Sequence, residues 1–144
     1  MEKYYSINDI AEMTGLSDRT LRNYIKSGTL SGEKIDGVWQ FTAEEYGDFI
    51  TDKSVIPSLK AKKNALVYDF LLNEKKKAPE ICSILDFPAD LTEAMKISDF
   101  FCSMANASAG KVRMNFSYQG GNARVMLEGD AVTAAKIIGK YFGK

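Results

Sequence analysis

The side chains that could contact a polyanion form one short run near the start of the chain. Leu21, Tyr24 and Ile25 recur at the i, i+3, i+4 spacing of an apolar helix face. The polar residues of the same run are left for the outer faces: Arg19, Thr20, Arg22, Asn23 and Lys26. Side chains of these types hydrogen-bond to base edges and to phosphates in the DNA major groove. The run therefore predicts a helix that reads DNA.

Residue types that support other chemistry are scarce. The chain has no histidine, which removes the commonest general base and the commonest metal ligand. Its two cysteines, Cys82 and Cys102, cannot supply a zinc site of four Cys and His ligands. Gly120-Gly121 fits a hairpin turn and not a phosphate cradle. We therefore expect no catalytic residues, no metal and no cofactor, and hence no enzyme.

The elements around the run read as a helix, a turn and a second helix. Ser6 can cap a helix from about residue 7 to residue 13, with Asp9 in its first turn. Gly15 fits the position after its end, and Ser17 can cap the next helix, which Gly28 stops. Helix, turn and helix in this order are a known way to place one helix in the major groove.

A hairpin and a third helix follow directly. Asp36-Gly37 stands between two short extended segments, and Asp-Gly favours a type I′ turn with positive φ at both residues. Thr42 and Glu45 have the spacing of a capping box at the start of a helix over about residues 43–51. The predicted order in this part is therefore helix-turn-helix and then a β-wing.

The rest of the chain predicts a connector and a small mixed unit. Pro57 is expected to interrupt the chain, and residues 58–77 read as one helix about 30 Å long at 1.5 Å per residue. Beyond it the pattern predicts strand, helix, strand, strand, helix, so the fold class is α+β. The predicted divisions are 1–52 (winged helix), 53–79 (helical connector) and 80–144 (C-terminal unit for dimerisation or ligand sensing).

Composition and charge limit the remaining possibilities. The 144 residues, 45% of them hydrophobic, suffice for one domain or two small ones, and the formal net charge is zero. Residues 1–50 hold five basic and nine acidic residues, a net charge of −4, which opposes binding to phosphates. No signal peptide and no apolar stretch of membrane-spanning length is recognised, so we expect a cytoplasmic protein without membrane contact. Buried, inert thiols are favoured over a redox switch at the two cysteines.

The run from Leu16 to Tyr24 resembles the recognition helix of the MerR family of bacterial regulators, whose pattern is S-x-R-T-L-R-Y-Y. The matching residues are Ser17, Arg19, Thr20, Leu21, Arg22 and Tyr24. The resemblance covers about the first third of the chain. It departs at Asn23, where the family has an aromatic residue. It departs again in the wing, where Trp39 or Gln40 stands in place of a phosphate-binding arginine.

The resemblance implies a DNA-binding transcriptional regulator that acts as a homodimer through residues 58–77, with the C-terminal unit as a second contact. A small-molecule effector is left open. The residues predicted to contact double-stranded DNA are Ser17, Arg19, Thr20, Arg22, Asn23, Tyr24, Lys26, Lys34, Trp39 and Gln40. Two alternatives stay open: an excisionase-like accessory protein, and a protein-interaction module that has the winged fold without DNA binding.

Overall fold

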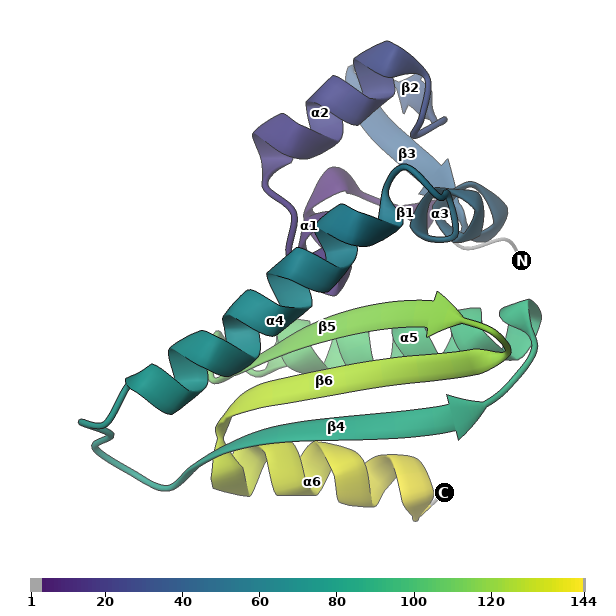
Figure 1. The fold of residues 1–144 in the computed structure, drawn as a ribbon. Helices are drawn as coiled ribbons and strands as arrows, with labels where there is room; N and C mark the ends of the chain where they lie inside the picture. Colours follow the sequence, from purple (N-terminus) through teal and green to yellow (C-terminus); the bar gives the residue numbers. More distant parts are fainter. Residues whose placement is uncertain (1–3, 144) are drawn as a thin grey trace.

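The structure, a computed structural model, describes residues 4–143. Figure 1 shows a group of short elements at one end and a three-stranded sheet with its helices at the other. The first group consists of β1 (Tyr4–Tyr5), α1 (Ile7–Thr14), α2 (Asp18–Ser27), β2 (Glu33–Ile35), β3 (Val38–Thr42) and α3 (Ala43–Ile50). Its strands form an antiparallel sheet of order β1-β3-β2.

The predicted caps of α1 and α2 are confirmed. The Ser6 hydroxyl accepts a hydrogen bond from the Asp9 backbone N–H, and the Asp9 carboxylate accepts one from the Ser6 N–H, both at 3.0 Å. Ser17 caps α2 with its hydroxyl alone, which accepts a hydrogen bond from the Thr20 backbone N–H. Gly15 (φ 76°) and Gly28 (φ 82°) end the two helices in the left-handed conformation that favours glycine. Local sequence thus determines where the two helices begin and end.

The hairpin turn is also confirmed, because Asp36 and Gly37 have φ angles of 51° and 79°. The hairpin is held at its base by Phe41, which is fully buried. Gly32 lies against that ring: a Cβ at residue 32 would come within 2.4 Å of a Phe41 ring carbon. A glycine is therefore required there to bring β2 against β3.

The connector helix differs from its prediction at both ends. α4 spans Ile56–Leu72, so it begins before Pro57 and ends five residues earlier than expected. Proline is tolerated in a first helical turn, where its missing N–H has no helical partner to lose. At the other end Lys76 folds back and its ammonium donates to the Phe70 carbonyl oxygen at 2.8 Å. A lysine that binds the last carbonyls of a helix stabilises its terminus.

The C-terminal part runs β4 (Glu80–Pro88), α5 (Leu91–Ala107), β5 (Val112–Gln119), β6 (Asn122–Asp130) and α6 (Ala131–Phe142). The three strands form an antiparallel sheet of order β4-β6-β5. Phe87 of β4 contacts Phe101 of α5 and Tyr141 of α6, so both helices pack on the same face of the sheet. The expectation of a mixed helix and sheet protein is confirmed.

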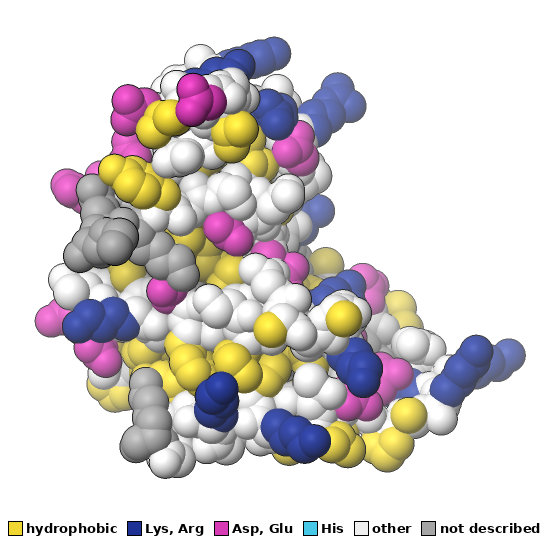
Figure 2. All heavy atoms as spheres, turned by 180° about the vertical axis from the view of Figure 1, so that it is seen from behind, with side chains coloured by type: hydrophobic (Ala, Val, Ile, Leu, Met, Phe, Trp, Pro, Cys, Tyr) yellow, Lys and Arg dark blue, Asp and Glu magenta, His cyan; other side chains and the backbone are white. Residues whose placement is uncertain are grey.

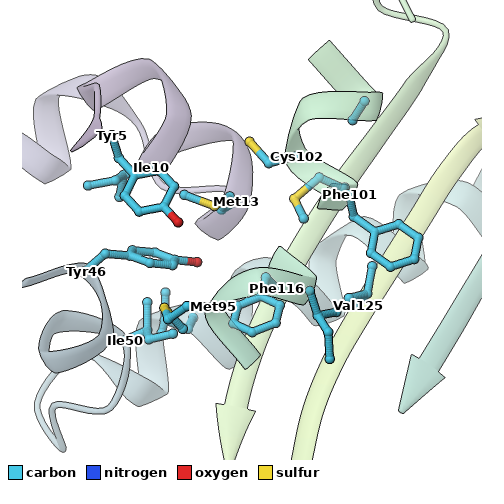
Figure 3. Close-up of a cluster of buried hydrophobic side chains, with 14 of the residues drawn as sticks. Tyr5, Ile10, Met13, Tyr46, Ile50, Met95, Phe101, Cys102, Phe116 and Val125 are labelled. Carbon is cyan, nitrogen blue, oxygen red and sulfur yellow. The ribbon is translucent and has the colours of Figure 1, made fainter. Parts of the chain in front are cut away.

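One hydrophobic core runs through both parts of the molecule (Figure 3). Met13 of α1 and Tyr46 of α3 are fully buried, and they face α5 and the sheet. The Ser98 hydroxyl of α5 donates to the Met13 sulfur at 3.0 Å. Burial raises the pKa of Tyr46, so its hydroxyl stays protonated. The helix-turn-helix is therefore packed against the C-terminal part, while the division into functional domains stays a prediction.

The two cysteines are free, and they lie on opposite sides of the sheet. Cys102 is buried in the core on α5. Cys82 has the opposite strand parity to Phe87, so it points to the face away from α5, beside its register partner Glu128. Burial, together with the nearby Glu128 carboxylate, raises the pKa of Cys82. This keeps the thiol in its less nucleophilic, protonated form.

Candidate nucleic-acid interface

The outer face of α2 carries four polar side chains in one stripe. Arg19, Arg22, Asn23 and Lys26 are exposed and follow one another at i, i+3, i+4 and i+7. Leu21 is fully buried on the opposite side. In Figure 1, α2 lies at the end of the molecule farthest from the C-terminal sheet, where the rest of the fold leaves its outer side open. The stripe therefore has both the side chains and the access to enter a groove.

The N-terminus of α2 uses two of the predicted contact residues for its own structure. The Ser17 hydroxyl accepts from the Thr20 backbone N–H at 3.1 Å and donates to the Thr20 hydroxyl at 2.9 Å. These bonds occupy groups that the helix start would otherwise leave unsatisfied. Ser17 and Thr20 thus position the helix that carries the arginines.

An ion pair on α2 involves one of the stripe arginines. Arg22 Nε lies 2.7 Å from an Asp18 carboxylate oxygen, with both side chains about half exposed. For Arg19 and Lys26, the structure of residues 4–143 records no ion pair. The positive charge offered to a polyanion is therefore concentrated at Arg19 and Lys26, and it is partly balanced at Arg22.

Tyr24 points inward. Its ring packs edge-on against Phe49 at 5.3 Å between centroids, and its hydroxyl lies 3.4 Å from the Ser58 hydroxyl at the start of α4. The sequence placed Tyr24 on the apolar face of the helix and also among the predicted DNA contacts. In the structure the hydroxyl faces α4, so Tyr24 connects the helix-turn-helix to the connector.

The wing brings the other predicted residues beside α2. Lys34 and Trp39 are register partners, and the Lys34 ammonium lies 5.9 Å from the centre of the Trp39 ring. Trp39 also stacks on Phe41 at 6.3 Å. Trp39 and Gln40 are half buried, whereas Lys34 is exposed. Lys34 is therefore the wing side chain best placed to contact a phosphate, and its ammonium lies over the ring of Trp39.

A hollow of about 250 Å³ separates α2 from the wing. Asp18, Arg22, Lys34 and Trp39 line it, together with Asn8 of α1 and Val38 of β3. Sequence patterns missed Asn8 and Val38, because only the fold brings the first turn of α1 next to the wing. Of the residues predicted to contact DNA, Arg22, Lys34 and Trp39 thus meet at this hollow, one each from α2, β2 and β3.

The surface near α2 and the wing carries both signs of charge. In Figure 2, the view from behind, Lys and Arg side chains lie together with Asp and Glu side chains at the upper end, where Figure 1 places α2 and the wing. Some acids of residues 1–50 lie elsewhere: Glu44 lines a second hollow, of about 500 Å³, between α3 and α5. Glu44 therefore lies outside the candidate interface, whereas Asp18 lines it.

Neither a cluster of metal-ligating side chains nor a membrane-spanning helix is found within residues 4–143. No group of three or more Cys, Asp or Glu side chains in that range is arranged to hold a metal ion. No helix in the same range is long and apolar enough to span a bilayer.

Comparison with known proteins agrees with the geometry. A family model described as a helix-turn-helix domain matches residues 4–45. Searches of curated proteins and of solved structures found no match. The matched range includes α1, α2 and the wing, and thus every residue of the candidate interface. Residues 4–45 therefore form a helix-turn-helix domain, which supports a DNA-binding regulatory role.

Proposed function

We propose that the protein is a sequence-specific, DNA-binding transcriptional regulator of MerR-like type that acts as a homodimer. The observation that carries this proposal is the exposed stripe of Arg19, Arg22, Asn23 and Lys26 on α2, next to the wing. The resemblance of residues 16–24 to the MerR recognition helix supports it independently of the fold.

The side chains of the stripe can divide the work of recognition. Arginine binds guanine O6 and N7 with two parallel hydrogen bonds, and asparagine binds adenine N6 and N7 in the same manner. Arg19 and Asn23 are therefore proposed to read bases. Lys26 and Lys34 lie at the end of α2 and on the wing, and are proposed to neutralise phosphates.

The homodimer is proposed to form through α4, as the MerR resemblance implies. The C-terminal half of α4 keeps Tyr68, Leu71 and Leu72 exposed, the last two at 67% and 62%. Leu66 and Phe70, on another side of the same helix, are half buried. A helix with apolar side chains both toward and away from its own fold is suited to pack against a second copy.

A protein-interaction module is the second candidate. The Asp18 carboxylate stands in the candidate interface, and Trp39 or Gln40 occupies the place of a wing arginine. Both features weaken attraction to phosphates. An excisionase-like accessory protein would use the same surface on DNA but would need no effector.

Selection of sheared genomic DNA by the purified protein, followed by sequencing, separates these candidates. The selection should be run at about 50 and about 200 mM salt, because phosphate contacts weaken steeply over that range. A protein with Arg19→Ala and Arg22→Ala serves as the negative variant, and Lys140→Ala on α6 as the matched control. Enrichment of a palindromic site by the wild type and the control supports a dimeric regulator. Absence of enrichment at low salt contradicts it.

A further inference from the structure

The outer edge of β4 is open. β4 pairs with β6 along its whole length, from Glu80 to Pro88, and within residues 4–143 no strand pairs with its other side. Unpaired N–H and C=O groups along an edge strand form a template for another strand. Proteins usually block such edges with charges, proline or a covering segment. The central run Ile81–Leu85 contains neither a charged residue nor a proline.

The other edge strand is protected. β5 contacts both α1 and α5, and it carries the charged Arg113. On β4 the charge nearest the centre is that of Asp86, and Arg124 balances it with two hydrogen bonds of 2.7 and 2.9 Å. The two edges of the same sheet therefore differ, and β4 is the less protected of the two.

Apolar side chains beside the β4 edge are incompletely covered. Ile84, at the middle of the strand, is 54% exposed on the face away from the helices. On the helical face Ile81, Leu85 and Phe87 are only half buried. This part of the sheet therefore lacks some of the cover that its hydrophobic residues require.

The outer side of α6 continues this apolar surface. Val132, Ala135, Gly139 and Phe142 are exposed and recur at i, i+3, i+7 and i+10, along one helix face. The Phe142 ring stacks on Phe87 of β4 at 5.9 Å between centroids, which places this face of α6 beside the β4 edge. The edge of β4 and the exposed face of α6 thus form one surface.

We propose that a second copy of this chain docks on this surface, with the two β4 strands antiparallel about a twofold axis at Ile84. This register places Ile84 opposite its copy, Ile81 opposite Phe87, and Asp86 opposite Cys82. A shift of the axis to Ser83 would instead place Asp86 opposite Glu80, and facing like charges are unfavourable. Of these two registers, the one centred on Ile84 avoids facing like charges, and it is self-complementary, as a twofold interface requires.

The exposed faces of the two α6 helices supply buried area that the contact between two strand edges alone would lack. In the proposed register both α6 helices lie on the same side of the joined sheet, next to the axis. A Cβ built on Gly139 meets nothing within 4 Å, so the helix surface is open there and allows a close approach. Stable interfaces bury about 800 Å² per partner. The exposed face of α6 and the edge of β4 are proposed to contribute this buried area together.

This interface goes beyond the proposed function and is separate from α4. The joined sheet would have the order β5-β6-β4-β4-β6-β5, with the two β5 strands about 24 Å apart at about 4.8 Å per strand. Because α1 packs on β5, the two helix-turn-helix domains lie at the outer ends. The stripe on α2 stays uncovered, so the association leaves both DNA-reading surfaces free.

Analytical ultracentrifugation without DNA tests the interface, over a concentration series. The background is Leu71→Lys, which removes the α4 contact. In that background the chain is expected to form a dimer through β4, and addition of Ile84→Lys should weaken this association roughly tenfold or more, because two lysines would face each other. The proposal is overturned if the Leu71→Lys chain is monomeric, or if Ile84→Lys leaves its association unchanged.

A second variant distinguishes a weakened interface from a misfolded chain. Gly139→Gln in the same background should raise thermal stability, because glycine is unfavourable inside a helix, and yet weaken association. Unchanged association would contradict the contact between the exposed faces of the two α6 helices. Hydrogen exchange gives an independent reading: the β4 amides should become more protected as concentration rises, and concentration-independent exchange overturns the proposal. Since DNA is absent, failure of DNA binding and failure of this interface are observed separately.

Discussion

Arg22 and Asp18 form an ion pair across one turn of α2, with Nε of Arg22 2.7 Å from the carboxylate. Both side chains are about half exposed, so the pair itself adds little to the stability of the fold. Its position matters more, because Arg22 lines the hollow between α2 and the wing. The Asp18 carboxylate pairs with Arg22 and adds a negative charge at the place where a phosphate would approach.

Replacement of Asp18 by Asn should therefore strengthen DNA binding. The change frees Arg22 and removes a repulsive charge, and we expect roughly threefold tighter binding or more at about 50 mM salt, with a smaller gain at about 200 mM. Fluorescence anisotropy on a selected site measures this effect. Glu44→Gln makes the same change of charge in the hollow between α3 and α5 and should leave affinity unchanged. Weaker binding by Asp18→Asn would show that the carboxylate takes part in recognition.

Lys34 on the wing should contribute one phosphate contact. Lys34→Ala is expected to reduce the slope of log Kobs against log salt by about 0.9, because each neutralised phosphate releases counterions. The order of preference among DNA sequences should stay the same, since phosphate contacts carry no base information. Lys140→Ala on α6 is the control and should not alter the slope. An unchanged slope for Lys34→Ala would exclude the wing from the interface.

Tyr24→Phe separates a structural role from a DNA contact. The hydroxyl faces Ser58 at 3.4 Å, a long hydrogen bond, so its loss should lower the free energy of unfolding by about 0.5 kcal/mol. Affinity for DNA should change less than about twofold, because the hydroxyl faces α4. Urea unfolding and anisotropy measure the two effects. A large loss of affinity with unchanged stability would instead show that the Tyr24 hydroxyl contacts DNA.

Asp86 provides a pH-dependent test of the C-terminal sheet. Its hydrogen bonds with the Arg124 guanidinium lower the pKa of Asp86 to about 2, below the value near 3.9 expected in the unfolded chain. The ionised carboxylate therefore stabilises the fold above about pH 4, and this contribution is lost as the pH falls toward 2. Asp86→Asn should be less stable at pH 7, by at most about 1 kcal/mol because the pair is exposed.

The difference in stability between wild type and Asp86→Asn should then shrink between about pH 4 and about pH 2. Urea unfolding at several pH values measures it. Asp48→Asn, on the exposed side of α3, controls for a general effect of charge. A difference that stays constant down to the lowest pH would contradict the role of the ion pair with Arg124.

Local structure was readable from sequence wherever one short segment determines the backbone. Ser6, Gly15, Asp36 and Gly37 act on their own neighbours through caps and turns, and each behaves as predicted. The end of α4 was predicted less well. Helical periodicity does not show that Lys76 folds back to bind the carbonyl of Phe70, so the helix was extended too far.

Relations between distant segments were not readable. Ser98 and Met13 are 85 residues apart, and no pattern indicated that they meet in a common core. The same limit applies to the candidate interface: the stripe on α2 followed from periodicity, whereas Asn8 joins it only through folding. The ion pair of Arg22 with Asp18 has the i, i+4 spacing that could have indicated it. The direction of the Tyr24 hydroxyl depends on α4 and could not have been inferred.

The most direct test of the account is the affinity of Arg19→Ala for a DNA site selected by the wild type. Arg19 is exposed, so the fold and thermal stability should be unchanged. If α2 reads DNA, Arg19→Ala should lose about 1–3 kcal/mol of binding free energy and show relaxed specificity at one base pair. Wild-type affinity and specificity in a fully folded Arg19→Ala protein would contradict DNA reading by α2.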